Sequence, residues 1–326
     1  MPQTFEGDGV LPLIDKPGTP KIRPGKRMVT RWGAININGS YSGKKVELAE
    51  VASKMGLDVL AVSEIRVRSE KEEEVGEYKV YLSGVKAGIA QWGEGLYIRK
   101  EMERNVVAIR YINERLMWID LRVASKKIRI VSVYSHCEGT DQEKMDSFYD
   151  ALSDVVVRGK DKDSVLLMGD FDARIGNRTE GYEKVMGKFG EDMEANSKGK
   201  QLLDFCASMG LVITNSFFKN KNIHRYTWEV RGTRSVIDYI ITDQEFRKAV
   251  RDTCVFRGFF DDTDYYLICS EIGIVRLKVQ EVSTKHCTTK KAWRRIGDLY
   301  LAADNFNLVQ PLKHVDYDRN DCLGRK

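Results

Sequence analysis

Proline is almost absent from the part of this sequence that can build a folded body. Between Met28 and Gln310 no proline occurs, and apolar runs typical of strands recur there between turn-forming residues. The first 27 residues instead hold five of the six prolines among basic side chains, namely Pro2, Pro12, Pro17, Pro20 and Pro24 beside Lys21, Arg23, Lys26 and Arg27. Such a composition cannot form a core. We therefore expect a flexible basic leader over 1–27 and one continuous ordered domain over 28–275.

Hydrophobic periodicity predicts both strands and helices in that domain. Runs rich in valine and isoleucine predict strands at 28–37, 58–63, 116–123, 128–134, 164–168, 211–214, 236–241 and 266–272. Helical spacing of apolar residues marks three segments, from Leu48 to Met55, Met145 to Val156 and Leu202 to Met209. The mixture favours an α/β fold in which helices cover the outside of packed sheets. Beyond Ile274 the pattern decays, so we expect a basic tail of low order over 276–326, with one short helix at 299–302.

The overall composition is that of a globular protein inside a cell. Hydrophobic residues make up 42% and aromatic residues 10% of the chain, which is enough for a sizeable core. Lys and Arg outnumber Asp and Glu by 53 to 48, a small excess that suits a polyanionic partner without being specific for one. The six cysteines form no C-x-x-C pair, which favours reduced thiols. No apolar run of about 18 residues and no signal-peptide pattern occurs, so we expect neither a membrane span nor secretion.

Acidic residues follow directly after several of the expected strands. The run at 164–168 leads into Asp170 and Asp172, and the run at 58–63 leads into Glu64. Hydrolysis of a phosphodiester needs a metal to neutralise phosphate oxygens, a carboxylate to position or deprotonate water, and a cation or acid to balance the developing charge. These strand ends are therefore candidates for such a site, although acids after a strand also form turns or stay solvated.

Taken in order, the motifs of the chain resemble those of one family. They are NING at 36–39, LDVLAVSE at 57–64, VSVY at 131–134, LLMGDFDARIG at 166–176, GKQLLDFCASMGLVITN at 199–215, YTW at 226–228, SVIDYI at 235–240 and TD at 263–264. The series resembles the apurinic-like endonucleases of LINE retrotransposons, in the endonuclease/exonuclease/phosphatase superfamily, over about Met28 to Ile274. The resemblance implies a four-layer α/β sandwich of the DNase I-like or exonuclease III-like type, with two mixed sheets flanked by helices.

The resemblance also implies a role for each matching position. Glu64 would hold Mg²⁺, or Mn²⁺ in its place, with Asn38 as a second metal-binding position, because Mg²⁺ prefers oxygen ligands. Asn36 and Asp172 would stand at phosphate-binding positions. The catalytic positions would be Asp170 for the attacking water, Tyr134 at the phosphate, Asp238 to orient the family's histidine, Asp264 in the same cluster, and Tyr265.

Structural alternatives exist for these roles. Asn36 and Asn38 could shape a turn beside Gly39, and Tyr134 could be a core aromatic with its hydroxyl at the rim. Asp238 lies in an apolar strand, where an acid is costly unless paired, so it could instead bind a structural arginine.

Position 265 departs from the family pattern. The family has a histidine there, which can be cationic near neutral pH, whereas Tyr265 carries no positive charge. Loss of a charged donor predicts a rate lower by on the order of 10³-fold or more. Asp172 replaces the family's asparagine and either adds negative charge beside the phosphate or recruits a second metal ion. His136 replaces a proline and either partly stands in for the lost histidine or is a loop residue.

Two functions from different classes follow. The first is a metal-dependent endonuclease that nicks DNA, weakened by Tyr265, with no small-molecule cofactor beyond the metal and a nuclear or at least intracellular location. The second is a catalytically inactive derivative that binds nucleic acid or protein. A phosphatase or sphingomyelinase on the same fold is a weaker alternative. Since no reverse-transcriptase sequence follows the endonuclease region, we expect a fragment, a host-captured domain or a decayed copy of an element.

Overall fold

The computed structural model describes residues 23–124, 126–159, 163–258 and 263–278, and its compact unit spans Arg27–Val275. The first strand begins at Arg23 and the last ends at Lys278. Most of the expected leader and tail, including the helix expected at 299–302, lies outside the described residues.

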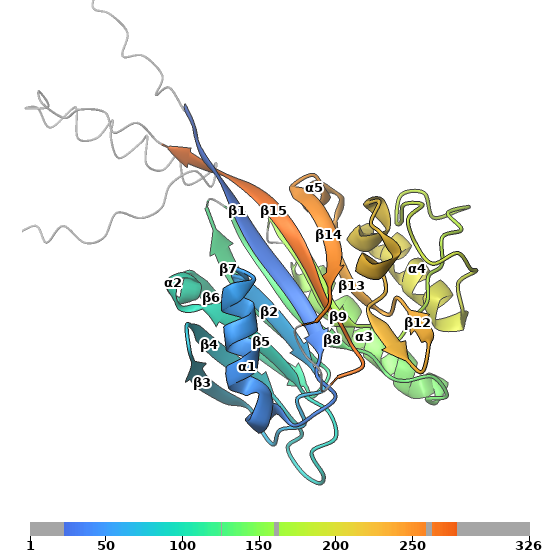
Figure 1. The fold of residues 1–326 in the computed structure, drawn as a ribbon, viewed down its shortest axis with the longest axis horizontal. Coiled ribbons are helices and arrows are strands. Elements are labelled where there is room, and N and C mark those ends of the chain that lie inside the picture. Colours follow the sequence, from blue (N-terminus) through green and yellow to red (C-terminus); the bar gives the residue numbers. More distant parts are fainter. Residues whose placement is uncertain (1–22, 125, 160–162, 259–262, 279–326) are drawn as a thin grey trace, which may run out of the picture. The chain divides into compact units, whose positions relative to one another are not determined.

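One sheet contains seven of the described strands, in the order β14-β15-β1-β2-β5-β4-β3. Strands β1 and β2 are parallel, whereas β2 and β5 are antiparallel, so the sheet is mixed. Figure 1 shows β1 and β15 side by side although they come from opposite ends of the compact unit. The bounds are β1 (Arg23–Asn36), β2 (Val59–Ser63), β3 (Lys71–Val75), β4 (Tyr78–Ser83), β5 (Glu94–Arg99), β14 (Val250–Phe256) and β15 (Leu267–Lys278).

A second sheet contains six of the described strands, in the order β10-β13-β9-β8-β7-β6. Its β8 and β9 are parallel and their neighbours antiparallel, so this sheet is mixed as well. The bounds are β6 (Val106–Asn113), β7 (Leu116–Val123), β8 (Lys126–Tyr134), β9 (Ser164–Asp170), β10 (Leu211–Ile213) and β13 (Asp238–Asp243).

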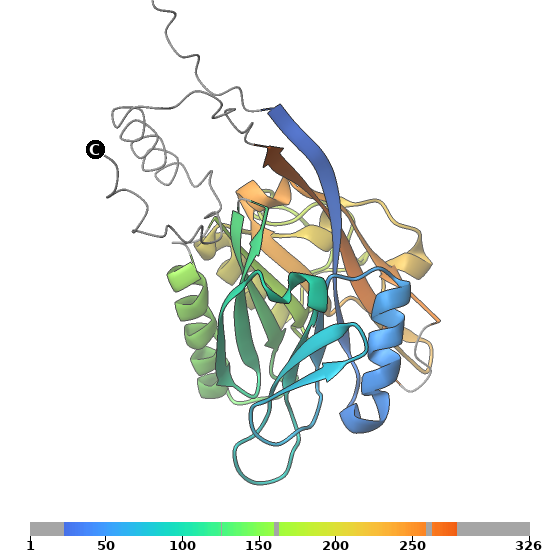
Figure 2. The same cartoon turned by 90° about the vertical axis from the view of Figure 1, so that its left-hand side faces the viewer.

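Three longer helices cover the outer faces of the two sheets. The apolar side of α1 (Tyr41–Lys54) packs on the first sheet. Helices α3 (Gln142–Gly159) and α4 (Ser197–Met209) pack on the second sheet. Figure 2 shows α1 and α3 on opposite sides, with the strands of both sheets between them. The four-layer α/β sandwich expected from the sequence is therefore confirmed.

Alternation along the central strands explains this layering. In β9, Leu166 and Met168 face the other sheet, while Val165 and Leu167 face the helices. All seven residues of β9 are buried, as expected for a strand covered on both faces. The strand is therefore a continuous apolar run instead of an alternating one, and it carries Asp170 to its buried end.

The strands and helices expected between residues 28 and 275 are all present among the described elements, but some ends differ. The strand expected at 236–241 is β13, which begins at Asp238. The N–H of Ile237 donates to the Thr227 hydroxyl (3.0 Å) and that of Val236 to the Glu191 carboxylate, so side chains replace the strand ladder there.

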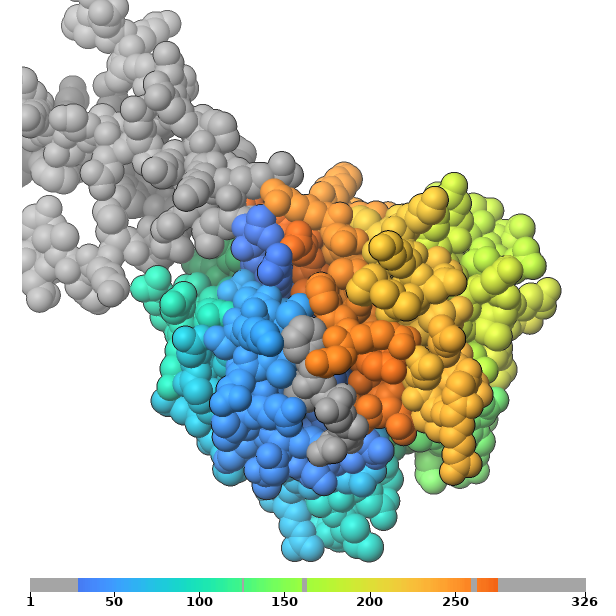
Figure 3. Space-filling view, viewed as in Figure 1, coloured from blue at the N-terminus to red at the C-terminus, as the bar shows by residue number. Residues whose placement is uncertain are grey.

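Short elements complete the described chain. Strands β11 (Trp228–Val230) and β12 (Thr233–Ser235) form a separate hairpin. The remaining helical turns are α2 (Lys100–Glu103), α5 (Gln244–Arg247), η1 (Thr214–Phe217) and η2 (Asn222–His224). Figure 3 shows blue N-terminal and orange C-terminal segments sharing one face of the compact unit. Among the residues described, no helix has both the length and the apolar character to cross a membrane.

Candidate active site

Strand register brings three of the expected site residues into one row of the second sheet. Tyr134 at the end of β8 is aligned with Asp170 at the end of β9, and Asp170 is aligned with Asp238 at the start of β13. The three side chains are 6%, 2% and 1% exposed. Because they come from β-strands packed on both faces, their positions are held by the core beneath them.

A hydrogen bond between side chains joins the two sheets at this row. Asn36, at the end of β1, is fully buried, and its Nδ2 donates to Oδ2 of Asp170 over 2.8 Å. The other carboxylate oxygen of Asp170 accepts the backbone N–H of Asp172 over 2.9 Å. Burial, together with the charges of Asp172 and Glu64, raises the pKa of Asp170 to about 6, and the Asn36 bond opposes part of that rise. Asp170 can therefore be a carboxylate at neutral pH and still accept a proton.

Asp238 is a buried acid without an ordinary hydrogen-bond partner on either carboxylate oxygen. The nearby Thr227 hydroxyl partly favours the charged form of Asp238 and so lowers its pKa. The oxygen of the same hydroxyl accepts the backbone N–H groups of Ile237 and Asp238 over 3.0 and 3.1 Å. Burial, and then the charge of Asp170, raises the pKa of Asp238 well above its usual range. No arginine pairs with Asp238 among the described residues, so the structure gives no support to the structural ion pair that the sequence left open.

Tyr265 lies next to the same acids. Its N–H donates to the Thr263 hydroxyl over 3.3 Å, and that hydroxyl donates to the carbonyl of Asn36 over 2.9 Å. Burial, and then the charges of Asp170 and Asp238, raises the pKa of Tyr265 far above the usual tyrosine value. The Tyr265 hydroxyl can therefore donate a hydrogen bond, but it stays uncharged.

Two other expected contributors stand apart from this cluster. Asp264 is exposed, and its carboxylate makes no hydrogen bond or ion pair within the described chain. His136 packs edge-on against Phe148 of α3, with ring centres 5.9 Å apart. Burial and the nearby charges of Arg115 and Lys198 lower the pKa of His136 to about 4. His136 is therefore neutral at physiological pH and supplies no cationic donor in place of the missing histidine.

The two expected metal-binding side chains converge on one point, and an arginine lies there. The Nη2 atom of Arg66 donates to Oε1 of Glu64 and, over 2.9 Å, to Oδ1 of Asn38. One carboxylate and one amide oxygen are ligands that Mg²⁺ accepts, since this ion keeps several waters and takes further oxygens from a phosphate. Within the described ranges no three His, Cys, Asp or Glu side chains gather as a metal site. The donors therefore fit a loosely held Mg²⁺ once Arg66 leaves them.

Asp172 is also paired with a cation. Its Oδ2 accepts from Nζ of Lys198 over 2.6 Å, and the same ammonium donates to the carbonyl of His136. Lys198 is in the first turn of α4 and its side chain is 9% exposed. The pairing offsets the negative charge that Asp172 would otherwise add beside a phosphate. The sequence expectation did not include this partner, because the two residues are 26 positions apart.

A cation–π stack supports Tyr134. The Arg115 guanidinium lies 4.9 Å from the ring centre of Tyr134 and 4.9 Å from that of Trp92. Arg115 is buried and also donates to the carbonyl of Ser135 over 2.8 Å. Arg115 and Trp92 come from hairpin turns without a motif, so the sequence alone carried no signal for either.

A further buried acid lies below the row. Glu94, the first residue of β5, is fully buried between the sheets and accepts from the Ser132 hydroxyl of β8. Burial raises the pKa of Glu94 well above its usual range, and the charge of Asp170 adds to this rise. Burial therefore favours the neutral form of the Glu94 carboxyl.

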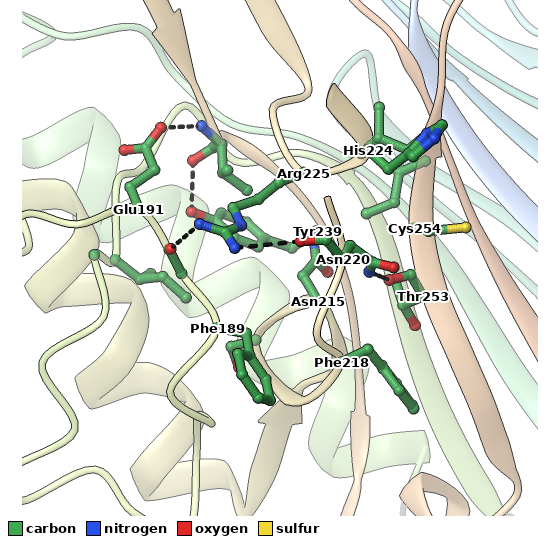
Figure 4. Close-up of a pocket in the computed structure, with 17 residues that line it drawn as sticks. Phe189, Glu191, Asn215, Phe218, Asn220, His224, Arg225, Tyr239, Thr253 and Cys254 are labelled. Atoms are coloured by element: carbon green, nitrogen blue, oxygen red, sulfur yellow. Dashed lines mark hydrogen bonds between the residues drawn. The ribbon is translucent and has the colours of Figure 1, made fainter. Parts of the chain in front are cut away.

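Two hollows in the described part of the chain have linings that do not include these residues. Figure 4 shows a cavity into which Arg225 reaches, with its Nη1 donating to the carbonyl of Gly190 over 3.1 Å. The cavity measures about 20 Å³, room for about one water molecule. A wider hollow of about 480 Å³ has equal numbers of acidic and basic side chains, and its lining is Arg178, Glu180, Tyr182, Glu194, Ala195, Lys200 and Leu203. Neither hollow is therefore a better candidate than the row of strand ends for binding a polyanionic substrate.

Comparison with curated proteins finds distant relatives. The chain is 23% identical over 255 residues to craniofacial development protein 2 of Bos taurus and of Tragulus javanicus. The matched region covers 78% of this chain but only 42% and 44% of those two proteins, so the chain spans less than half of their length. The chain matches no family model.

Comparison with solved structures finds the same fold in nucleic-acid enzymes. The endonuclease domain of TRAS1, a telomere-specific non-LTR retrotransposon, has a TM-score of 0.56 and 15% identity, over 75% of this chain and 98% of that domain. The catalytic domain of Xenopus laevis APE2 has a TM-score of 0.56 and 14% identity, over 78% and 94%. A 3′ phosphatase of Neisseria bound to a product DNA hairpin has a TM-score of 0.54 and 14% identity, over 74% and 99%.

Proposed function

Because the chain has the endonuclease/exonuclease/phosphatase fold and distant similarity to craniofacial development protein 2 and the TRAS1 endonuclease domain, we propose that it is a metal-dependent phosphodiesterase that nicks DNA at a lowered rate. The observation that supports this most is the hydrogen bond from Asn36 to Asp170, which joins two sequence motifs across the two sheets. A DNA substrate would give the protein a nuclear location.

Two side chains of the row, those of Asp170 and Tyr134, act on the water and the phosphate in this proposal. The Asp170 carboxylate accepts a proton from the attacking water, since its pKa of about 6 leaves it mostly ionised at pH 7. The Tyr134 hydroxyl donates to the scissile phosphate. Mg²⁺ or Mn²⁺ held by Glu64 and Asn38 would supply positive charge to the phosphate oxygens. The uncharged Tyr265 donates a hydrogen bond in place of a cationic group, which lowers the rate.

Nicking of supercoiled plasmid with Mg²⁺ or Mn²⁺ tests the proposal. We expect slow nicking by the wild type, none by Glu64→Ala, and a rate higher by on the order of 10² to 10³-fold for Tyr265→His, because a charged donor is regained. Nicking by purified Glu64→Ala at the wild-type rate would refute the proposal, because the cutting would then not depend on the expected metal-binding carboxylate.

A binding protein without catalysis is the second candidate, and the pairing of Arg66 with Glu64 and Asn38 favours it. In that case wild type and Tyr265→His both bind DNA, with an affinity that falls steeply as salt rises, and neither nicks it. Nicking by Tyr265→His but not by the wild type would instead show that the protein is a nuclease disabled at position 265.

A further inference from the structure

The Arg66 side chain holds together the two loops that carry the expected metal ligands. One loop follows β1 and contains Asn38, and the other follows β2 and contains Glu64. A single nitrogen of Arg66 donates to both residues, and the N–H of Gly39 donates to the carbonyl of Glu64 over 2.8 Å. The guanidinium therefore lies at the point where the two ligand oxygens meet.

The backbone is shaped around this arginine. Gly39 has φ +84°, and a Cβ placed on it would lie 2.7 Å from Cδ and 2.9 Å from Nε of Arg66. Asn38, Glu64 and Arg66 have φ of 50°, 59° and 50°, a left-handed conformation that non-glycine residues seldom adopt. Such strain persists only where the surroundings hold it. The backbone conformations of both loops therefore fit the position of the Arg66 side chain.

Charge and exposure allow this arginine to be exchanged for a metal ion. The side chain of Glu64 is 14% exposed, so its charge is partly screened from water and needs a nearby cation. The Arg66 side chain is 43% exposed, which gives the guanidinium a path into solvent. A guanidinium and a divalent cation that contact the same oxygens repel each other, so each weakens the binding of the other.

We propose that Arg66 is an internal cation that competes with the divalent metal for Glu64 and Asn38, so that metal binding requires displacement of Arg66 and is weakened by it. The inference rests on the proposed function only for the identity of the two ligands. Without metal, Arg66 balances the negative charge of Glu64.

The affinity of the full chain for Mn²⁺, measured from the free-ion signal in electron paramagnetic resonance, tests this inference. Arg66→Ala should bind Mn²⁺ tighter by about tenfold or more, the scale of one hydrogen bond to a charged group. Arg68→Ala is the matched control, because this neighbouring arginine is exposed and its guanidinium has no partner in the described part of the chain. Its affinity should stay within about twofold of the wild type, since a remote surface charge acts weakly.

The double variant Arg66→Ala with Glu64→Ala should lose the gain, which places the effect at these oxygens. Unchanged or weaker Mn²⁺ binding by Arg66→Ala, with an unaltered circular dichroism spectrum, overturns the inference. A gain equal to that of Arg68→Ala overturns it too, because general charge would explain both. Tighter binding without any nicking would leave the inference standing and count against the nuclease, so the two proposals can fail separately.

Discussion

At the scale of single residues, the buried carboxyl of Asp238 links the stability of the fold to pH. Its pKa is raised well above the ordinary value of an aspartate in the unfolded chain. The folded state therefore binds its proton more tightly than the unfolded state. The resulting contribution to stability is complete below the unfolded pKa of about 4 and is lost as pH rises through the folded value.

Asp238→Asn removes this titration. As pH rises from 5 to 9, the free energy of unfolding of the variant should increase relative to that of the wild type. The increase is about 1.4 kcal/mol per pH unit until the pH reaches the raised pKa of Asp238. Urea denaturation at the two pH values measures the difference. Asp264→Asn is the matched control, because Asp264 is exposed, and it should show no such change. A constant difference at both pH values would contradict the expected shift.

At the scale of elements, the pairing of β8 with β9 depends on one glycine. Gly169 has φ +143°, and a Cβ there would lie 2.0 Å from the backbone oxygen of Val133. We expect Gly169→Ala to destabilise the fold by more than about 4 kcal/mol, since the colliding atom is backbone and the conformation suits only glycine. Gly210→Ala, at the C-terminal cap of α4 with φ +68° and nothing within 4 Å, should cost about 1 kcal/mol. Thermal unfolding of both variants checks this, and equal losses would contradict it.

The elements that the sequence predicted are those buried on both faces or clearly amphipathic. Strands β3, β6 and β14 escaped prediction, and all three lie at the edges of their sheets. β3 consists of Lys71, three glutamates and Val75, and mostly exposes its side chains, so no apolar period marks it. Strands β4 and β5 are buried but carry charged residues among the apolar ones, as with Glu94 in the core.

The sequence named candidate site residues at strand ends and in the loops after β1 and β2, but not the cations that pair with them. The motifs placed Asn36, Tyr134 and Asp170 at or just after the ends of expected strands and Asp238 inside one. The register of β8, β9 and β13 aligned Tyr134, Asp170 and Asp238, and a hydrogen bond joins Asn36 to Asp170. The partners Arg66 and Arg115 lie in loops and Lys198 in the first turn of α4, so their contacts depend on how these segments pack over the strand ends. The conformation of such a segment depends on the elements around it and leaves no hydrophobic period in the sequence. These cations could therefore be found only in the structure.

At the scale of the whole molecule, the charge balance predicts how DNA would be bound. The chain has a net charge of +5, and contacts with phosphates release counterions, so binding should weaken as salt rises. Between 50 and 200 mM salt we expect the affinity for a duplex oligonucleotide to fall on the order of tenfold or more. Fluorescence anisotropy measures this, with Glu64→Ala expected to bind at least as well as wild type. An affinity that does not change with salt concentration would contradict binding through contacts with the DNA phosphates.

The place of β1 between β15 and β2 also constrains how the protein is made. During synthesis from the N-terminus, β1 leaves the ribosome more than 200 residues before the strand that completes its side of the sheet, since β15 begins only at Leu267. Until then β1 presents an unpaired apolar edge of the kind that joins other chains. A ribosome that stalls before β15 would therefore release a nascent chain prone to aggregation and dependent on chaperones, even though Asn36 and the row of Tyr134, Asp170 and Asp238 had already been translated.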